Sequence, residues 1–375
     1  MRHRASIFLF VTLLVSGTFS AEAGGRADEW IALNTRPSYI MPTHGFYNGW
    51  NALGKPLRAG FSADIQYGFS FSGRSAFQGC GLGIHSFGSN QLLGTPVSLY
   101  IFQGAPLFRL SQDLTIGYEW NFGISAGWKD NGMVTVSPLN AYINVAALLS
   151  WKPDIHWCLN IGPEYTHFSN GDTRFPNGGA NTLNLRMGVK YVFNPEESVH
   201  EPEKVFEFNE SGIPVRERMS YDLTIFGSWR ADRSIVDGHL HIINKAFPVA
   251  GLNFNPLYHF NDYLSAGAAL DLIYDGSANL LSETDENGVL AYSMPGFSKQ
   301  IAAGLSARAE LKMPIFAVNI GIGHNLFHSG QDLKGIYGIF ALKAFMTDML
   351  YLNIGYRLSS VLYSHNLMFG IGIRL

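Results

Sequence analysis

Segments in which every second residue is apolar recur along the sequence. They cover residues 61–72, 114–128 and 367–375, where aromatic and aliphatic residues alternate with glycine and polar residues. Because successive side chains of a β-strand point to opposite faces, each segment predicts a strand with one apolar face. The segments are long and carry large aromatic residues near their ends, which favours membrane-spanning strands over those of a soluble sandwich.

The composition supports a membrane protein that crosses the bilayer with strands. Only 15% of the 375 residues are charged, 14% are aromatic, and the formal net charge is -3. Such a chain cannot cover its surface with charge as an ordinary soluble protein does. Beyond the N-terminus no apolar run is long enough for a membrane helix, and backbone polar groups in lipid must pair within the protein, which leaves a closed barrel.

The predicted fold is therefore an all-β, transmembrane antiparallel β-barrel of the outer membrane. About fifteen strands can be assigned, so one or two assignments are wrong if the strand number is even. The pattern leaves open whether the chain closes as one large barrel or two smaller ones. Charged residues expected on the inner faces either line a pore or pair across a filled lumen, and pairing is favoured in a narrow barrel: Asp64, Glu119, Glu164, Arg186, Lys190, Arg308 and Glu310.

The chain is divided by two segments that do not read as strands. Residues 1–23 combine basic residues, a short apolar run and small residues at Ala21 and Ala23, which predicts a signal peptide for export. Ten of the 26 residues in 194–219 are charged, which predicts a solvated connector. The predicted parts are thus 1–23, an N-terminal segment 24–57, a barrel region 58–193, the connector, and a second strand region 220–375.

Little in the sequence indicates partners outside the membrane or a cofactor. The near-neutral charge gives no electrostatic basis for binding nucleic acid. Cys80 and Cys158 are the only cysteines and have no metal-binding spacing, so they either form one disulfide or stand as separate thiols. We expect no metal and no cofactor.

The hairpin YTHFSNGDTRFPNGGANTL, residues 165–183, carries polar residues where the alternation predicts lipid contact. The short connection 152–154 is typical of periplasmic turns, and the longer polar loop 170–180 suits the outer side. On the strand before the loop, every second residue from Trp157 to Tyr165 belongs to the apolar face. The same alternation places His167 and Ser169 on the lipid side. The next strand places Asn181 there too.

A histidine, a serine and an asparagine on one face suggest nucleophilic catalysis. Imidazole can take the proton of a serine hydroxyl, and a third group must orient the imidazole. A hairpin symmetric about its loop would set Ser169 opposite Asn181 and His167 opposite Leu183. The alternative is that these residues are turn formers that mark where the strand leaves the membrane. Asn170, Gly171 and Asn177 are candidate oxyanion donors at the head of the hairpin.

HFSNG, followed by Pro176, Asn177 and Asn181, resembles the active-site hairpin of outer-membrane lipid A 3-O-deacylases of the PagL type. FQGCGLGIHSFG, LGTPVSLYIFQGAP and GYEWNFGISAGW resemble acyloxyacyl hydrolases from the Bacteroidetes. The resemblance covers roughly residues 60–193 and is weaker over 220–375. It implies a lipid-facing site in the outer membrane, with His167 as general base, Ser169 as nucleophile and Asn170 as oxyanion contributor helped by Asn177. Its implied substrate is lipid A or lipopolysaccharide.

One residue departs from that family, because the PagL type has a glutamate where this chain has Asn181. Glu164 is near in sequence but has inward parity, so it is not a replacement. An Asn there is similar to outer-membrane phospholipase A, which depends on calcium; Asp172 and Asn177 lie where that family's calcium-binding residues would fall. We expect a serine esterase acting on lipid A. A calcium-dependent phospholipase A and a non-catalytic, porin-like barrel stay open as alternatives.

Overall fold

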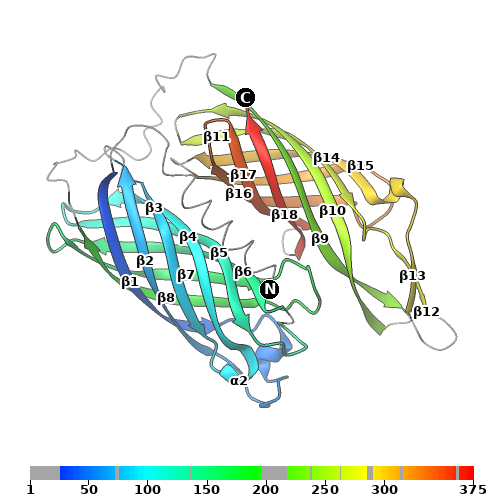
Figure 1. The fold of residues 1–375 in the computed structure, drawn as a ribbon, viewed down its shortest axis with the longest axis horizontal. Helices are drawn as coiled ribbons and strands as arrows, with labels where there is room; N and C mark the ends of the chain where they lie inside the picture. Colours follow the sequence, from blue (N-terminus) through cyan, green and yellow to red (C-terminus); the bar gives the residue numbers. More distant parts are fainter. Residues whose placement is uncertain are drawn as a thin grey trace, which may run out of the picture. The chain divides into compact units, whose positions relative to one another are not determined.

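The computed structural model forms two compact units, each built around one closed antiparallel β-barrel (Figure 1). It describes residues 26–71, 76–135, 137–193, 195, 218–236, 239–261, 263–284, 290–312, 316–359 and 363–375. The predicted signal peptide and nearly all of the predicted connector lie outside these residues. Within the described ranges, no helix has the length and apolar character needed to cross a membrane.

The first barrel has eight strands that pair in chain order, and its last strand closes on its first. The strands are β1 (Arg26–Ile40), β2 (Ala59–Phe71), β3 (Phe77–Ser86), β4 (Gly94–Arg109), β5 (Leu114–Trp128), β6 (Leu139–Trp151), β7 (Trp157–Ser169) and β8 (Ala180–Val192). A 3-10 turn, η2 (Gly45–Asn48), and a single helical turn, α2 (Asn90–Leu93), lie in its connecting loops.

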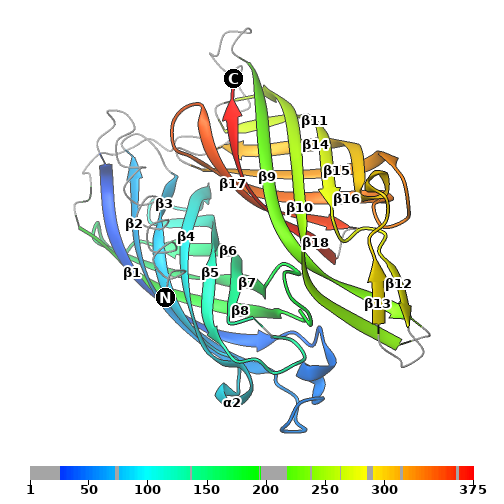
Figure 2. The same ribbon diagram turned by 45° about the vertical axis from the view of Figure 1, so that its right-hand side comes forward.

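The second barrel also has eight strands, and β18 closes it on β9. They are β9 (Met219–Val236), β10 (His239–His259), β11 (Leu264–Asp275), β14 (Ile301–Lys312), β15 (Phe316–His328), β16 (Gly335–Phe345), β17 (Leu350–Ser359) and β18 (Tyr363–Arg374). A separate hairpin, β12 (Leu281–Thr284) and β13 (Leu290–Ser293), and a 3-10 turn, η4 (Phe297–Gln300), follow β11 (Figure 2).

The predicted fold class is confirmed, and the open question of barrel number is answered by two barrels. The barrel strand that was not predicted from the sequence is β1, which lies in the segment 24–57 that was set apart from the barrel. The short strands β12 and β13, outside the barrels, were not predicted either. Its inner face carries the buried polar residues Asn34 and Arg36, while Leu33 and Tyr39 are exposed on the outer face. The first barrel therefore begins at Arg26 and not near residue 58.

The two faces of the strands have the polarity of a protein surrounded by lipid. Along β7, Trp157, Leu159, Ile161 and Tyr165 are exposed, whereas the alternating Glu164 is buried. Large apolar side chains outside and polar side chains inside are the pattern of a membrane barrel. The faces predicted for β7 and β8 are thus the observed ones.

Both lumens are filled by ion pairs. In the first barrel, Arg36 pairs with Asp64 and with Glu164 (Nε to Oε1, 2.7 Å), and Arg186 pairs with Glu119 (Nη1 to Oε1, 2.6 Å). A cavity of about 30 Å³ beside these groups has room for only one or two water molecules. The charged side chains thus pair across the lumen, as predicted for a narrow barrel.

The second barrel has its own buried ionic network. The Lys343 ammonium contacts Asp222 and Glu310, each at 2.5 Å. Arg374 pairs with Asp222 at 2.7 Å and also with Glu310. Two cations thus share two carboxylates, so each buried charge has a partner of opposite sign.

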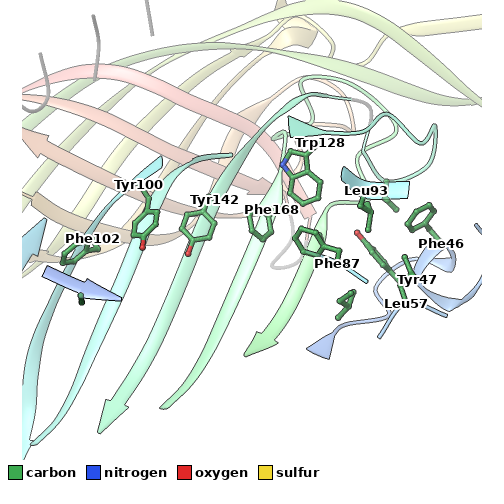
Figure 3. Close-up of a cluster of buried hydrophobic side chains, with 14 of the residues drawn as sticks. Phe46, Tyr47, Leu57, Phe87, Leu93, Tyr100, Phe102, Trp128, Tyr142 and Phe168 are labelled. Atoms are coloured by element: carbon green, nitrogen blue, oxygen red, sulfur yellow. The ribbon is translucent and has the colours of Figure 1, made fainter. Parts of the chain in front are cut away.

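An aromatic cluster lies inside the first barrel and includes Phe168 near the end of β7 (Figure 3). The ring of Phe168 lies 5.1 Å from that of Trp128, 5.3 Å from that of Tyr142 and 5.4 Å from that of Phe87. Phe168 lies between His167 and Ser169 in sequence and points inward. This packing fixes the end of β7 from inside the barrel and leaves its neighbours on the outer face.

Candidate functional site

The hairpin of β7 and β8 sets His167 beside Asn181, in a register other than the expected one. His167 pairs directly with Asn181, Phe168 with Ala180 and Tyr165 with Leu183. The expectation that Ser169 lies opposite Asn181 and His167 opposite Leu183 is wrong by two residues. A slip of two keeps every side chain on its predicted face, so the parity of the site is unchanged.

The physical reason for the shift is where the two strands stop pairing. Phe168 and Ala180 form the last pair, so the residues between them are 169–179, and their middle lies one residue earlier than that of 170–180. Within this loop Gly171, Asp172 and Gly179 have positive φ angles of 66°, 59° and 61°. Position 179 also has little room, because an added Cβ there would lie 2.6 Å from the Phe168 carbonyl oxygen.

His167 and Asn181 form a direct side-chain hydrogen bond. The imidazole Nδ1 lies 2.7 Å from the Asn181 Oδ1. Because a carbonyl oxygen only accepts, Nδ1 carries the proton and Nε2 is the unprotonated nitrogen of the neutral ring. This is the tautomer that a histidine base needs in order to take a proton from a hydroxyl.

Ser169 is linked to a second asparagine. The Asn177 Nδ2 donates to the Ser169 Oγ at 3.0 Å, and the Asn170 backbone N–H donates to the Asn177 Oδ1 at 3.2 Å. Ser169 is 5% exposed and Asn170 7% exposed. The Asn177 carboxamide is thus held by Asn170 with its N–H groups directed to the serine oxygen. Gly171 follows in the chain with a left-handed backbone.

Two residues that contact the site were not found from the sequence. The Tyr165 hydroxyl donates to the Asn181 Oδ1 at 2.7 Å, and the Asn181 Nδ2 donates to the Thr43 Oγ1 at 3.3 Å. The outward parity of Tyr165, two residues before His167, was a signal that pointed to it. Thr43 is 138 residues away from Asn181 in the chain and gave no signal.

The loop after β1 is hydrogen-bonded to Asn181 in β8 and to Gly179 just before β8. The Met41 N–H donates to the Asn181 carbonyl oxygen at 2.9 Å, and the Tyr47 hydroxyl donates to the Gly179 carbonyl oxygen at 2.6 Å. Burial raises the pKa of Tyr47, so its phenol stays protonated as a donor. These bonds place Thr43 against Asn181.

The first barrel contains another histidine in contact with serines, but this one, His85, lies inside the barrel. His85 is buried inside the barrel, and its Nδ1 and Nε2 lie 2.9 Å from the hydroxyls of Ser62 and Ser98, respectively. Both ring nitrogens are engaged and the ring faces no lipid. A serine beside a histidine is therefore not sufficient, and the outward face sets the hairpin site apart.

The cysteines are both free thiols, Cys80 in β3 and Cys158 in β7, so they do not form a disulfide. Within the part of the chain that the structure describes, no three histidine, cysteine, aspartate or glutamate side chains gather closely enough to hold a metal ion.

Comparison with known families gives a match over the second barrel. Residues 219–375 match the family model described as "Acyloxyacyl hydrolase, C-terminal domain". This is the part of the chain for which the motif resemblance is weaker. The match shows that the second barrel is similar to that domain. It lies outside β7 and β8 and does not reach the candidate site.

Comparison with curated proteins finds no match, whereas solved β-barrel structures give distant ones. Neisserial surface protein A is 12% identical, with a TM-score of 0.33, over 45% of this chain and 99% of that protein. The siderophore receptor PirA from Pseudomonas aeruginosa is 7% identical, with a TM-score of 0.27, over 94% of this chain and 81% of that one. The Ralstonia pickettii toluene transporter TbuX is 10% identical, with a TM-score of 0.18, over 96% and 92%.

Proposed function

We propose that the protein is an outer-membrane serine esterase that hydrolyses an acyl ester of lipid A, exported by its N-terminal signal peptide. The observation that carries the proposal is the hydrogen bond between His167 and Asn181 on the same outward face as Ser169. That bond leaves Nε2 of His167 as the base. The family match over the second barrel supports the hydrolase class.

In the proposed reaction Ser169 Oγ attacks the ester carbonyl carbon while His167 Nε2 takes its proton. The carbonyl oxygen becomes an oxyanion. The Asn177 Nδ2 lies on the serine side as its donor, and the Asn170 backbone N–H holds the Asn177 carboxamide in place. His167 then gives the proton to the departing sugar oxygen, which leaves an acyl-serine. Water, activated by the same histidine, attacks the acyl-serine and releases a fatty acid.

The site's place on the barrel wall fits a substrate that is part of the membrane. On the side of β6, Ile143 pairs with His167 and Ala141 with Ser169. These apolar outward neighbours give acyl chains a surface beside the serine. The substrate therefore reaches the nucleophile by lateral diffusion and need not leave the lipid.

The test is mass spectrometry of lipid A from cells with and without the protein. We expect the protein to remove one acyl chain, and an unchanged lipid A mass spectrum in cells with folded protein would contradict the proposal.

The alternative favoured by an Asn in the third position is a calcium-dependent phospholipase A. Purified protein should cleave lipid A and not phosphatidylethanolamine, with the same rate in EDTA and in calcium. Phospholipid cleavage that EDTA abolishes would establish the alternative.

Asn177→Ala is expected to lower kcat for ester hydrolysis by about 100-fold, with little change in KM, because it removes one oxyanion donor. Initial rates on purified lipid A in mixed micelles measure the effect. Asn160→Ala is a matched control, since Asn160 lies on the same strand away from the site and bonds Ser150 at 2.7 Å. Equal kcat values for the two variants would remove Asn177 from the site.

A further inference from the structure

We infer that Tyr165 is the positioning residue that orients the Asn181 carboxamide, and through it the tautomer of His167; this inference rests on the proposed esterase function. Tyr165 does not touch the reacting atoms. Its hydroxyl holds the Asn181 carboxamide, which in turn orients the His167 imidazole.

The Asn181 Oδ1 accepts two hydrogen bonds of equal length. One comes from the His167 Nδ1 at 2.7 Å and the other from the Tyr165 hydroxyl at 2.7 Å. A carbonyl oxygen has two lone pairs, so both are used. At the other end of the same carboxamide, Nδ2 donates to Thr43 at 3.3 Å. The side chain of Asn181 therefore has a partner at both ends.

An asparagine at this position needs an orienting group, whereas a glutamate does not. A carboxylate presents an acceptor oxygen whichever way it turns, so it always selects the Nδ1–H form of the histidine. A carboxamide that turns over presents an N–H donor, which selects the form with the proton on Nε2. That form cannot take the proton of Ser169. The departure from glutamate thus creates a requirement that Tyr165 meets.

Tyr165 meets the requirement because a phenol is a better hydrogen-bond donor than acceptor. It favours the orientation in which Oδ1, and not Nδ2, faces both its hydroxyl and His167. Its ring is held on the outer wall, 37% exposed, and lies opposite Leu183 in the ladder. From there the hydroxyl reaches diagonally to Asn181, a distance that long side chains span between neighbouring strands. Near lipid, where water competes less, such a bond is stronger.

Tyr165→Phe keeps the ring and removes only the hydroxyl. We expect kcat on lipid A to fall about tenfold with KM unchanged, which corresponds to the loss of one hydrogen bond. We also expect a change that a merely structural role would not produce. In 15N NMR of histidine-labelled protein in micelles, wild-type His167 should be in the Nδ1–H form, and the variant should contain both tautomers. His167→Gln identifies the His167 signals among those of the 12 histidines.

Tyr39→Phe is the matched control, because Tyr39 is a 47% exposed tyrosine on the outer face of β1 and pairs with Leu183 in the ladder. It should leave both kcat and the tautomer as in wild type. An unchanged tautomer in Tyr165→Phe overturns the inference whatever its activity. If wild-type protein shows no esterase activity, the proposed function fails, and the tautomer measurement still decides the role of Tyr165.

Discussion

Ser169→Ala is expected to reduce kcat for lipid A deacylation by at least about 1000-fold, the scale on which removing a triad nucleophile acts. The change deletes one oxygen atom, which is the proposed nucleophile. His167 and Asn181 keep their mutual hydrogen bond, because the serine takes no part in it. What remains is the smaller acceleration provided by the oxyanion donors and substrate binding.

The loss must be separated from a loss of folding. Barrel formation is measured by the heat-dependent migration of the protein in gel electrophoresis, which we expect to be unchanged. Lipid A mass spectra and labelling by a fluorophosphonate probe report the activity and the nucleophile. Ser137→Ala, at a partly exposed loop serine, is the control and should be labelled like wild type. A Ser169→Ala protein that is still labelled and still deacylates lipid A would show that the nucleophile lies elsewhere.

The faces of the strands could be predicted from the sequence because they depend on parity alone. A side chain's face follows from whether its position is odd or even, so the alternation of β7 gave the outward direction of His167 without any knowledge of its neighbours. The missed strand, β1, shows the limit. Its inner positions hold Asn34 and Arg36, whose partners Asp64 and Glu164 lie on other strands, so they looked like loop residues.

The side-chain contacts within the site could not be predicted from the alternation of apolar and polar residues. The pairing of His167 with Asn181 follows from where the strands stop pairing, at Phe168 and Ala180, and symmetry about the middle of 170–180 predicted a different register. Thr43 reaches the site only because β1 closes the barrel against β8. The number of barrels could not be predicted for the same reason. Each barrel is closed by pairing of its first and last strands, which are far apart in sequence.

Glu164→Ala is expected to destabilise the first barrel by about 3–5 kcal/mol while leaving kcat per folded molecule within about twofold of wild type. Glu164 is 3% exposed, and its carboxylate pairs with Arg36 at 2.7 Å and accepts from Asn184 at 3.0 Å. Removing it leaves a buried guanidinium without one of its two carboxylates. The remaining partner of Arg36 is Asp64. Denaturant unfolding in detergent micelles, followed by tryptophan fluorescence, measures the stability.

The same variant decides which residue is the third member of the proposed triad. Glu164 is the glutamate nearest in sequence to His167 and Ser169, and a family pattern with a glutamate in the triad makes it an alternative to Asn181. Its inward position in the ladder opposite Asn184 argues for a structural role. Glu164→Gln keeps the shape and one acceptor oxygen but loses the charge, and it should lose less stability than Glu164→Ala. If both variants fold but lose activity as Asn181→Leu does, Glu164 acts on His167; if only Asn181→Leu loses activity, the outward asparagine has taken the glutamate's place.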